Sequence, residues 1–188
     1  DFMGGGERLV KTLCEDLNLD LALGNILEES FDLSGLSGNL INLEASSSIP
    51  MLRTLKRFHA FFIKTRFLQN YETVIYSGQN APLAIRNHSG GKNILYCFTP
   101  PRSIYDLHSV HLAALSPSNK LAHKIYNLFF KPLYENAVHK MDHVVAISNT
   151  TKKRIKSYLI LMLLLYILPV TQNIFNGRAR VIIICQLH

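Results

Sequence analysis

Short, almost wholly apolar runs alternate with longer amphipathic segments along this chain. The clearest runs are residues 71–76 (YETVIY), 93–98 (NILYCF) and 143–147 (HVVAI). Apolar runs of this length, rich in β-branched and aromatic residues, are typical of strands that are covered on both faces. Strands that alternate with helices favour a parallel sheet. We therefore expect an α/β fold, a Rossmann-like parallel sheet with flanking helices.

The remaining elements follow from local signals. Apolar residues at helical spacing predict helices over 7–17 and 120–140, and Pro132 is expected to kink the second. A basic helix is predicted over 51–69 and another helix over 150–158. Shorter strands are predicted over 19–23 and 39–43, and a helical turn over 81–86. No internal repeat is visible, so these elements are expected to share one domain.

Charge is unevenly distributed. Residues 1–50 carry nine acidic and two basic side chains, a net −7, whereas residues 51–158 carry sixteen basic and four acidic ones, a net +12. A strongly basic region attracts phosphate groups, nucleic acid or an anionic membrane surface. The alternative is a solvated helix face with scattered lysines, because charge describes association rather than fold.

Three glycines, Gly4, Gly5 and Gly6, directly precede the first predicted helix. Glycines at a helix N-terminus let backbone N–H groups approach an anion, and the helix dipole favours negative charge there. The segment fits neither GxGxxG nor the Walker pattern GxxxxGK[ST]. An ordinary turn is therefore the alternative to a phosphate-binding loop.

A second candidate loop follows the apolar run 93–98. Two prolines stiffen it, and it carries Thr99, Arg102, Tyr105 and Asp106. Arg102 has the geometry to grip a phosphate or carboxylate through two parallel hydrogen bonds. Tyr105 is expected to stack on a sugar ring. The alternative is a rigid turn with exposed polar groups.

A third segment, residues 148–151 (SNTT), begins the predicted helix 150–158. Ser148 is placed to cap this helix, and the free N–H groups of its first turn are placed to meet an anion. Helix capping alone also explains the segment.

Metal ligation and nucleophilic catalysis lack their usual patterns. His108 and His111 are three residues apart, but no further ligand pattern accompanies them and HExxH is absent. GxSxG is absent as well. The three cysteines lie far apart without a CxxC pair, which indicates neither a zinc site nor a disulfide framework and favours a reducing compartment. We expect no metal and no cofactor.

Taken together, these segments resemble the N-terminal domain of a family 4 glycosyltransferase of the GT-B fold. The resemblance covers about residues 1–158 and rests on GGGER, YETVIYSG, NILYCFTPPRSIYDL and DHVVAISNTTKKRIKSYL in that order. It implies the acceptor-side half of a two-domain enzyme. A strand before the glycines and a second, donor-binding domain are expected to be missing from this chain.

The resemblance also implies roles for individual residues. Gly4, Gly5 and Gly6 would approach the donor diphosphate, while Thr99, Arg102, Tyr105 and Asp106 would face the acceptor and the reacting sugar. Asp106 is the one catalytic candidate. Many relatives have His where this chain has Phe98, and that departure removes a polar group from the site. No DxD motif is present, and enzymes of this fold need no bound metal to stabilise the leaving diphosphate.

The implied function is transfer of a hexosyl group, such as mannosyl, from a nucleotide sugar such as GDP-mannose to a glycan or polyprenyl-linked acceptor. The chain alone is expected to have little activity. It is expected to be cytoplasmic, at the inner face of the cell membrane, and to bind no nucleic acid. The alternatives are a non-catalytic Rossmann-like binding module and, on charge alone, a basic nucleic-acid-binding domain.

Residues 159–188 depart from the rest of the chain. The run 159–170 (LILMLLLYILPV) is too short to cross a bilayer and lacks a helical period. When codons that could encode this region are read one base out of frame, they give an amino-acid sequence similar to the one that follows this domain in members of the family. We therefore expect an aberrant hydrophobic tail, the product of a shifted reading frame near Tyr158, that was not selected to fold.

Overall fold

The computed structural model describes residues 5–26, 35–159, 165–167 and 180–186. Seven strands form one sheet in the order β2-β1-β7-β3-β4-β5-β6, and every neighbouring pair is parallel. The strands are β1 (Asp20–Leu23), β2 (Leu40–Asn42), β3 (Thr73–Ser77), β4 (Lys92–Cys97), β5 (His143–Ala146), β6 (Leu165–Ile167) and β7 (Val181–Cys185). The expected α/β class with a Rossmann-like parallel sheet is confirmed.

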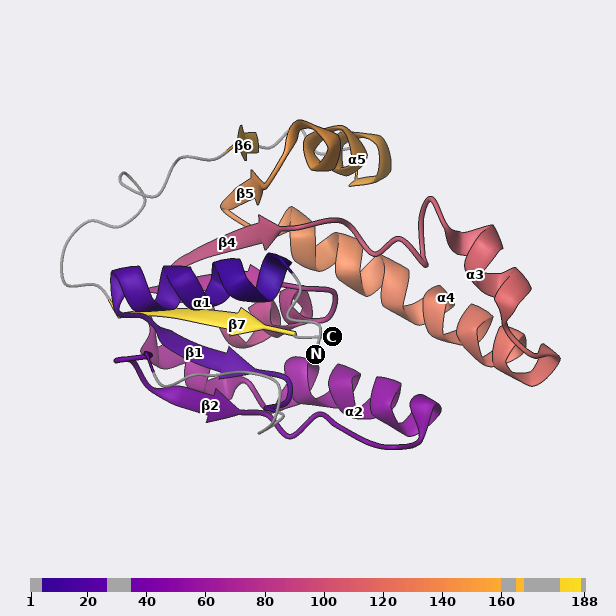
Figure 1. Cartoon of the computed structure of the whole chain (residues 1–188), viewed down its shortest axis with the longest axis horizontal. Coiled ribbons are helices and arrows are strands. Elements are labelled where there is room, and N and C mark those ends of the chain that lie inside the picture. The colour runs from indigo at the N-terminus through magenta and orange to yellow at the C-terminus, as the bar shows by residue number, and fades with distance from the viewer. Residues whose placement is uncertain (1–4, 27–34, 160–164, 168–179, 187–188) are drawn as a thin grey trace.

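Helices cover both faces of this sheet (Figure 1). They are α1 (Gly5–Leu17), α2 (Pro50–Ile63), α3 (His108–Ala114), α4 (Pro117–His139) and α5 (Asn149–Leu159), with the short 3-10 helices η1 (Arg66–Asn70) and η2 (Ala81–Asn87). α1 packs on one face through Val10 and Cys14, against residues such as Ile183 of β7. α2, η2, α4 and α5 contribute to the cluster on the other face, with residues such as Phe61 and Phe130.

The helices differ from the sequence expectation in three places. The predicted helix 51–69 ends at Ile63, and η1 continues it after a break at which the Thr65 hydroxyl donates to the carbonyl of Phe61 (3.0 Å). The predicted helix 120–140 begins earlier, at Pro117, and contains Pro132; the kink expected there stays a prediction. α3 was not predicted, because its seven residues are too few to show a helical period.

The most consequential correction concerns residues 159–188. Val181–Cys185 forms β7 and lies in the interior of the sheet, paired with β1 on one side and β3 on the other. Residues 165–167 form β6, which pairs with β5. The expectation that this whole range lies outside the fold is therefore wrong for these two strands. The rest of the apolar run lies outside the described residues, and the reading-frame hypothesis stays a prediction.

β7 takes the interior position because every one of its residues can be covered. Ile182 and Ile184 pack into the core on one face, while Ile183 packs into the core on the other. A continuous aliphatic run of this kind is what a parallel strand between two helical layers requires. The place between β1 and β3 is thus filled by a strand from the C-terminal part of the sequence. The strand expected before the glycines stays a prediction.

The loop after β3 fixes the carboxyl end of β7. Gly78 has a φ of +90°, and a Cβ at this position would lie 2.8 Å from the carbonyl oxygen of Gln186, so a side chain is excluded on both counts. The Gln186 side-chain oxygen accepts hydrogen bonds from the backbone N–H (2.9 Å) and the side-chain amide (2.7 Å) of Asn80. These buried contacts anchor the strand at the edge of the sheet where the candidate site lies.

Candidate functional site

The candidate site lies along the carboxyl edge of the sheet. The chain runs outward from β1 to β2, returns to β3, and then runs outward to β6, so its direction reverses around β7. In open α/β sheets, ligands bind outside the carboxyl ends of the strands at such a reversal. Three predicted segments lie at this edge: the N-terminus of α1, the loop after β4, and the N-terminus of α5.

The glycines at α1 differ in their surroundings. Gly4 lies outside the described residues. Gly5 is exposed, and a Cβ there would meet nothing within 4 Å. A Cβ on Gly6 would lie 3.0 Å from the ring of Phe98, the first residue after β4. Close packing against this aromatic ring therefore explains the glycine at position 6, whereas no described residue crowds Gly5.

Phe98 occupies the position between the glycine segment and the loop after β4. Its ring is half-buried and packs edge-on against Tyr96, with ring centroids 5.5 Å apart. The backbone carbonyl of Phe98 accepts a hydrogen bond from the Thr151 hydroxyl of α5 (2.8 Å). One residue thus connects all three segments, although its side chain offers no polar group to a ligand.

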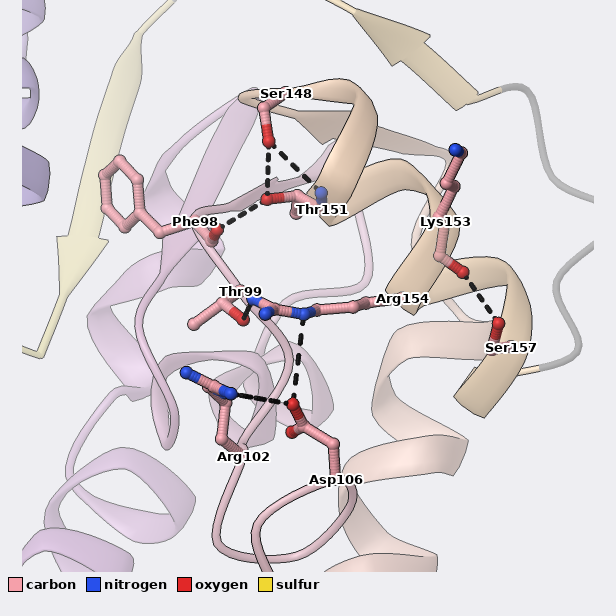
Figure 2. Close-up of polar contacts among 9 residues, drawn as sticks. All are labelled: Phe98, Thr99, Arg102, Asp106, Ser148, Thr151, Lys153, Arg154 and Ser157. Carbon is pink, nitrogen blue, oxygen red and sulfur yellow. Dashed lines mark hydrogen bonds and ion pairs between the residues drawn. The ribbon is translucent and has the colours of Figure 1, made fainter.

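The loop after β4 and helix α5 bring charged groups together (Figure 2). The Arg102 guanidinium donates through Nε and Nη2 to Oδ2 of Asp106, at 3.1 and 3.0 Å. Arg154 of α5 donates to the Thr99 hydroxyl at 3.4 Å, and its Nε lies 3.9 Å from the same Asp106 oxygen. Thr99, Arg102 and Asp106, three of the four residues expected in this loop, therefore meet beside a second arginine.

The two arginines control the charge of Asp106. The hydrogen bond from Arg102 holds the pKa of this carboxyl below its usual range, and the charges of Arg102 and Arg154 act in the same direction. Asp106 is therefore a carboxylate at neutral pH. A general base works best with a pKa near the working pH, so this arrangement suits Asp106 to orienting the arginines and to accepting hydrogen bonds from a ligand hydroxyl.

Tyr105 lies apart from these groups. Its ring stacks on Tyr158 of α5, with centroids 5.0 Å apart and planes 5° apart, and its hydroxyl donates to Glu135 of α4 at 3.1 Å. Burial, followed by the nearby Glu135 charge, raises the pKa of this phenol. The Tyr105 ring thus packs against Tyr158, and the expected stacking of Tyr105 on a sugar ring stays a prediction.

Ser148 acts as a helix cap. Its hydroxyl oxygen accepts a hydrogen bond from the backbone N–H of Thr151 (3.1 Å), and the hydroxyl donates to the Thr151 side chain at the same distance. The side chain expected at an anion site is therefore engaged by its own helix. Its functional contribution is to fix where α5, and with it Arg154, begins.

Sequence reasoning missed Arg154, although a signal was present. Thr151 and Arg154 are three residues apart on α5, so their side chains share one helix face. In the structure they contact Phe98 and Thr99, which are adjacent in the loop after β4. A basic cluster such as 152–154 (KKR) favours a solvated helix face by its sequence alone, and the pairing of β4 with β5 is what brings Arg154 to the loop after β4.

Thiol and metal chemistry find little support in the described part of the chain. Burial raises the pKa of both the Cys14 and the Cys97 thiol to about 12, so neither forms a thiolate nucleophile at neutral pH. His108 and His111 of α3 lie close to His123 of α4, with the rings of His111 and His123 4.5 Å apart. Among the described residues, however, no group of three or more His, Cys, Asp or Glu side chains is arranged to hold a metal ion.

Comparison with known proteins leaves the family open. Neither the protein-family models, nor the curated proteins, nor the solved structures contain a match to this chain. The fold and the site therefore define a Rossmann-like α/β protein with a pair of arginines at the carboxyl edge of its sheet.

Proposed function

We propose that this chain is the acceptor-side part of a glycosyltransferase that moves a hexosyl group, such as mannosyl, from a nucleotide sugar to a glycan or polyprenyl-linked acceptor. One observation carries the proposal. Arg102 and Arg154 converge with Thr99 and Asp106 at the carboxyl edge. Two of the motifs that resemble the glycosyltransferase family supply these four residues, one from the loop after β4 and one from α5.

The chemistry of this cluster suits glycosyl transfer. Guanidinium groups bind phosphate oxygens through paired hydrogen bonds, and the first turn of a helix such as α1 favours negative charge. Breaking the bond between a sugar and a diphosphate develops negative charge on the leaving group, which such fixed donors stabilise. Asp106 and Thr99 provide acceptors for sugar hydroxyls. GDP-mannose is the donor that we propose, with no metal or other cofactor.

Binding of an acceptor analogue tests the proposal. We would titrate the chain with a short-chain polyprenyl diphosphate oligosaccharide and compare the variants Arg154→Gln and Lys92→Gln. Lys92 is the control because it is exposed and is the first residue of β4, at the opposite edge of the sheet. A charge-assisted hydrogen bond contributes about 1.5–3 kcal/mol. Arg154→Gln should therefore weaken binding at least tenfold, and Lys92→Gln should leave it unchanged.

Other outcomes would redirect the assignment. Binding that Arg154→Gln and Lys92→Gln weaken equally, or no binding of the analogue at all, would refute the proposal. Binding of duplex DNA or RNA with a steep dependence on salt would favour the nucleic-acid alternative. The chain alone is expected to have little activity, so acceptor binding, and not release of GDP from added GDP-mannose, decides the proposal. The cytoplasmic location at the inner face of the cell membrane is part of the same proposal.

A further inference from the structure

Helix α4 has an exposed apolar stripe. Leu121, Ile125 and Leu128 recur at helical spacing on one face, and Phe129 lies beside them. All four are at least half exposed, and Leu128 is 71% exposed. Scattered exposed apolar side chains need no explanation, but four large ones in a row on one helix face indicate a surface that contacts a partner.

The charges beside this stripe identify the kind of partner. Lys120, Lys124 and Lys131 are the basic residues of this part of α4, and Glu135 is the single acidic residue in the whole helix. By helical spacing, all three lysines fall along the same side of the stripe. An apolar face with lysines along its border is the pattern of helices that lie in a membrane interface, with the apolar side chains among the acyl chains and the lysines at anionic headgroups.

Helix α2 adds a second element of the same kind. Its first two turns expose Met51, Leu52 and Leu55 together with Arg53 and Lys56, and the helix contains no acidic residue. α2 and α4 both pack against η2, which places them in one layer of the fold. Figure 1 shows the first halves of both helices extending past the carboxyl ends of the strands. The exposed apolar residues of both helices therefore lie toward the edge that carries the candidate site.

We infer that the first half of α2 and residues 120–129 of α4 form a docking surface for an anionic phospholipid membrane. The exposed apolar residues named above enter the interface, and Arg53, Lys56, Lys120 and Lys124 contact the headgroups, whereas Lys131 is paired with Glu135 (3.9 Å). Within the described residues, no helix is both long and apolar enough to cross a membrane, and docking on the surface needs none. The inference rests on the proposed function in one respect, because docking would bring the carboxyl-edge arginines to lipid-linked acceptors.

Vesicle sedimentation tests this surface. Phosphatidylcholine vesicles with phosphatidylserine should bind the chain, and pure phosphatidylcholine vesicles should bind it far more weakly. Each lysine near an anionic surface contributes about 1 kcal/mol, so the double variant Lys120→Gln/Lys124→Gln should weaken partitioning about thirtyfold. The matched control is Lys92→Gln/Lys140→Gln, which removes two exposed lysines at the amino edge and should bind like the parent chain.

A pair of leucine variants tests the contribution of the apolar stripe separately from that of the lysines. Leu128→Ser should reduce vesicle binding about tenfold, since burying one leucine side chain is worth at least 1.5 kcal/mol. Leu40→Ser, an exposed leucine on the edge strand β2, should not. Both sites are exposed, so circular dichroism should show that both variants fold. Equal binding to charged and neutral vesicles, or equal losses in either control pair, would overturn the inference.

The alternative partner for this docking surface is a second copy of the chain. If light scattering shows a dimer that Leu128→Ser dissociates, and vesicles do not bind, the stripe is a dimer interface and the membrane inference is wrong. The vesicle assay needs no acceptor, and Arg154→Gln should bind vesicles normally. Vesicle binding without acceptor binding would therefore refute the proposed function alone, and the reverse result would refute the docking surface alone.

Discussion

The carboxylate of Asp20 is held by hydrogen bonds at the start of β1. It accepts from the backbone N–H of Asn39 (2.6 Å), the Asn39 side-chain amide (3.1 Å) and the Tyr71 hydroxyl (2.8 Å). Burial alone would raise the pKa of this carboxyl, but these hydrogen bonds and the nearby Arg180 lower it below its usual value. The same contact, after burial, raises the pKa of Tyr71 to about 12.

We predict that Tyr71→Phe lowers the free energy of unfolding by about 1 kcal/mol at pH 7, the typical net value of one hydrogen bond. A carboxyl whose pKa is lowered by folding stabilises the fold above its unfolded pKa of about 3.9, and this contribution is lost as the pH falls through the folded pKa. Urea unfolding from pH 7 toward pH 3 should therefore show the effect of the variant shrinking. A constant effect across this range would contradict the assigned role of the Asp20 carboxylate.

Single residues show where sequence reasoning succeeds and where it stops. Ser148 was predicted as a helix cap because capping depends only on the next three residues, and the structure confirms it. Arg154 was missed because its partner, Thr99, lies 55 residues away along the chain. The contact of Tyr105 with Tyr158 was not predicted either, because Tyr158 lies 53 residues further along the chain.

At the scale of elements, the start of α1 is shaped by Phe98. We predict that Gly6→Ala destabilises the chain by about 1 kcal/mol, because the new methyl group would press on the Phe98 ring and overpacking of this kind costs about 1–3 kcal/mol. Gly5→Ala, with open space around it, should be neutral or should stabilise by up to about 1 kcal/mol through better helix propensity. Thermal unfolding of the two variants measures this difference in stability.

A second variant checks the cause. If the Phe98 ring is the obstacle, Phe98→Leu should reduce the cost of Gly6→Ala, and the two substitutions should be non-additive because the residues are in contact. Additive effects would show that the glycine is required for another reason, such as the approach of an anion to the helix N-terminus.

A strand or helix was predictable where the pattern of its own residues is enough to identify it. The buried runs that became β3, β4 and β5 were recognised because a strand between two helical layers has no polar face. β7 has the same pattern, but it was assigned to the aberrant tail because the chain around it lacked periodicity. The local sequence of a strand does not determine which strands will be its neighbours. The position of β7 between β1 and β3 follows only from the pairing of these strands in the structure.

At the scale of the whole molecule, β7 joins the two halves of the sheet. We predict that Ile182→Ala and Ile184→Ala each lower the free energy of unfolding by about 2–5 kcal/mol, the usual cost of removing a fully buried isoleucine side chain. Val110→Ala, at an exposed position of α3, should change it by less than about 0.5 kcal/mol. Urea unfolding measures all three.

The same experiment bears on the shifted reading frame. If Ile182→Ala and Ile184→Ala behave like Val110→Ala, then residues 181–185 do not stabilise the fold, as expected of a tail that was not selected. Large losses would show that this segment holds the sheet together whatever its origin in the gene.

The position of β7 also bears on how the chain folds. Asp20 pairs with Ile182 and Thr73 pairs with Val181, so the centre of the sheet closes through contacts between residues more than a hundred positions apart. Such a high contact order slows folding, because the entropy of closing a long loop is lost before the contacts form. Until β7 inserts, β1 and β3 each present an unsatisfied strand edge in the middle of the molecule, where another chain can add a strand. The interior strand that completes the native sheet thus also sets the interval during which the chain is prone to aggregate.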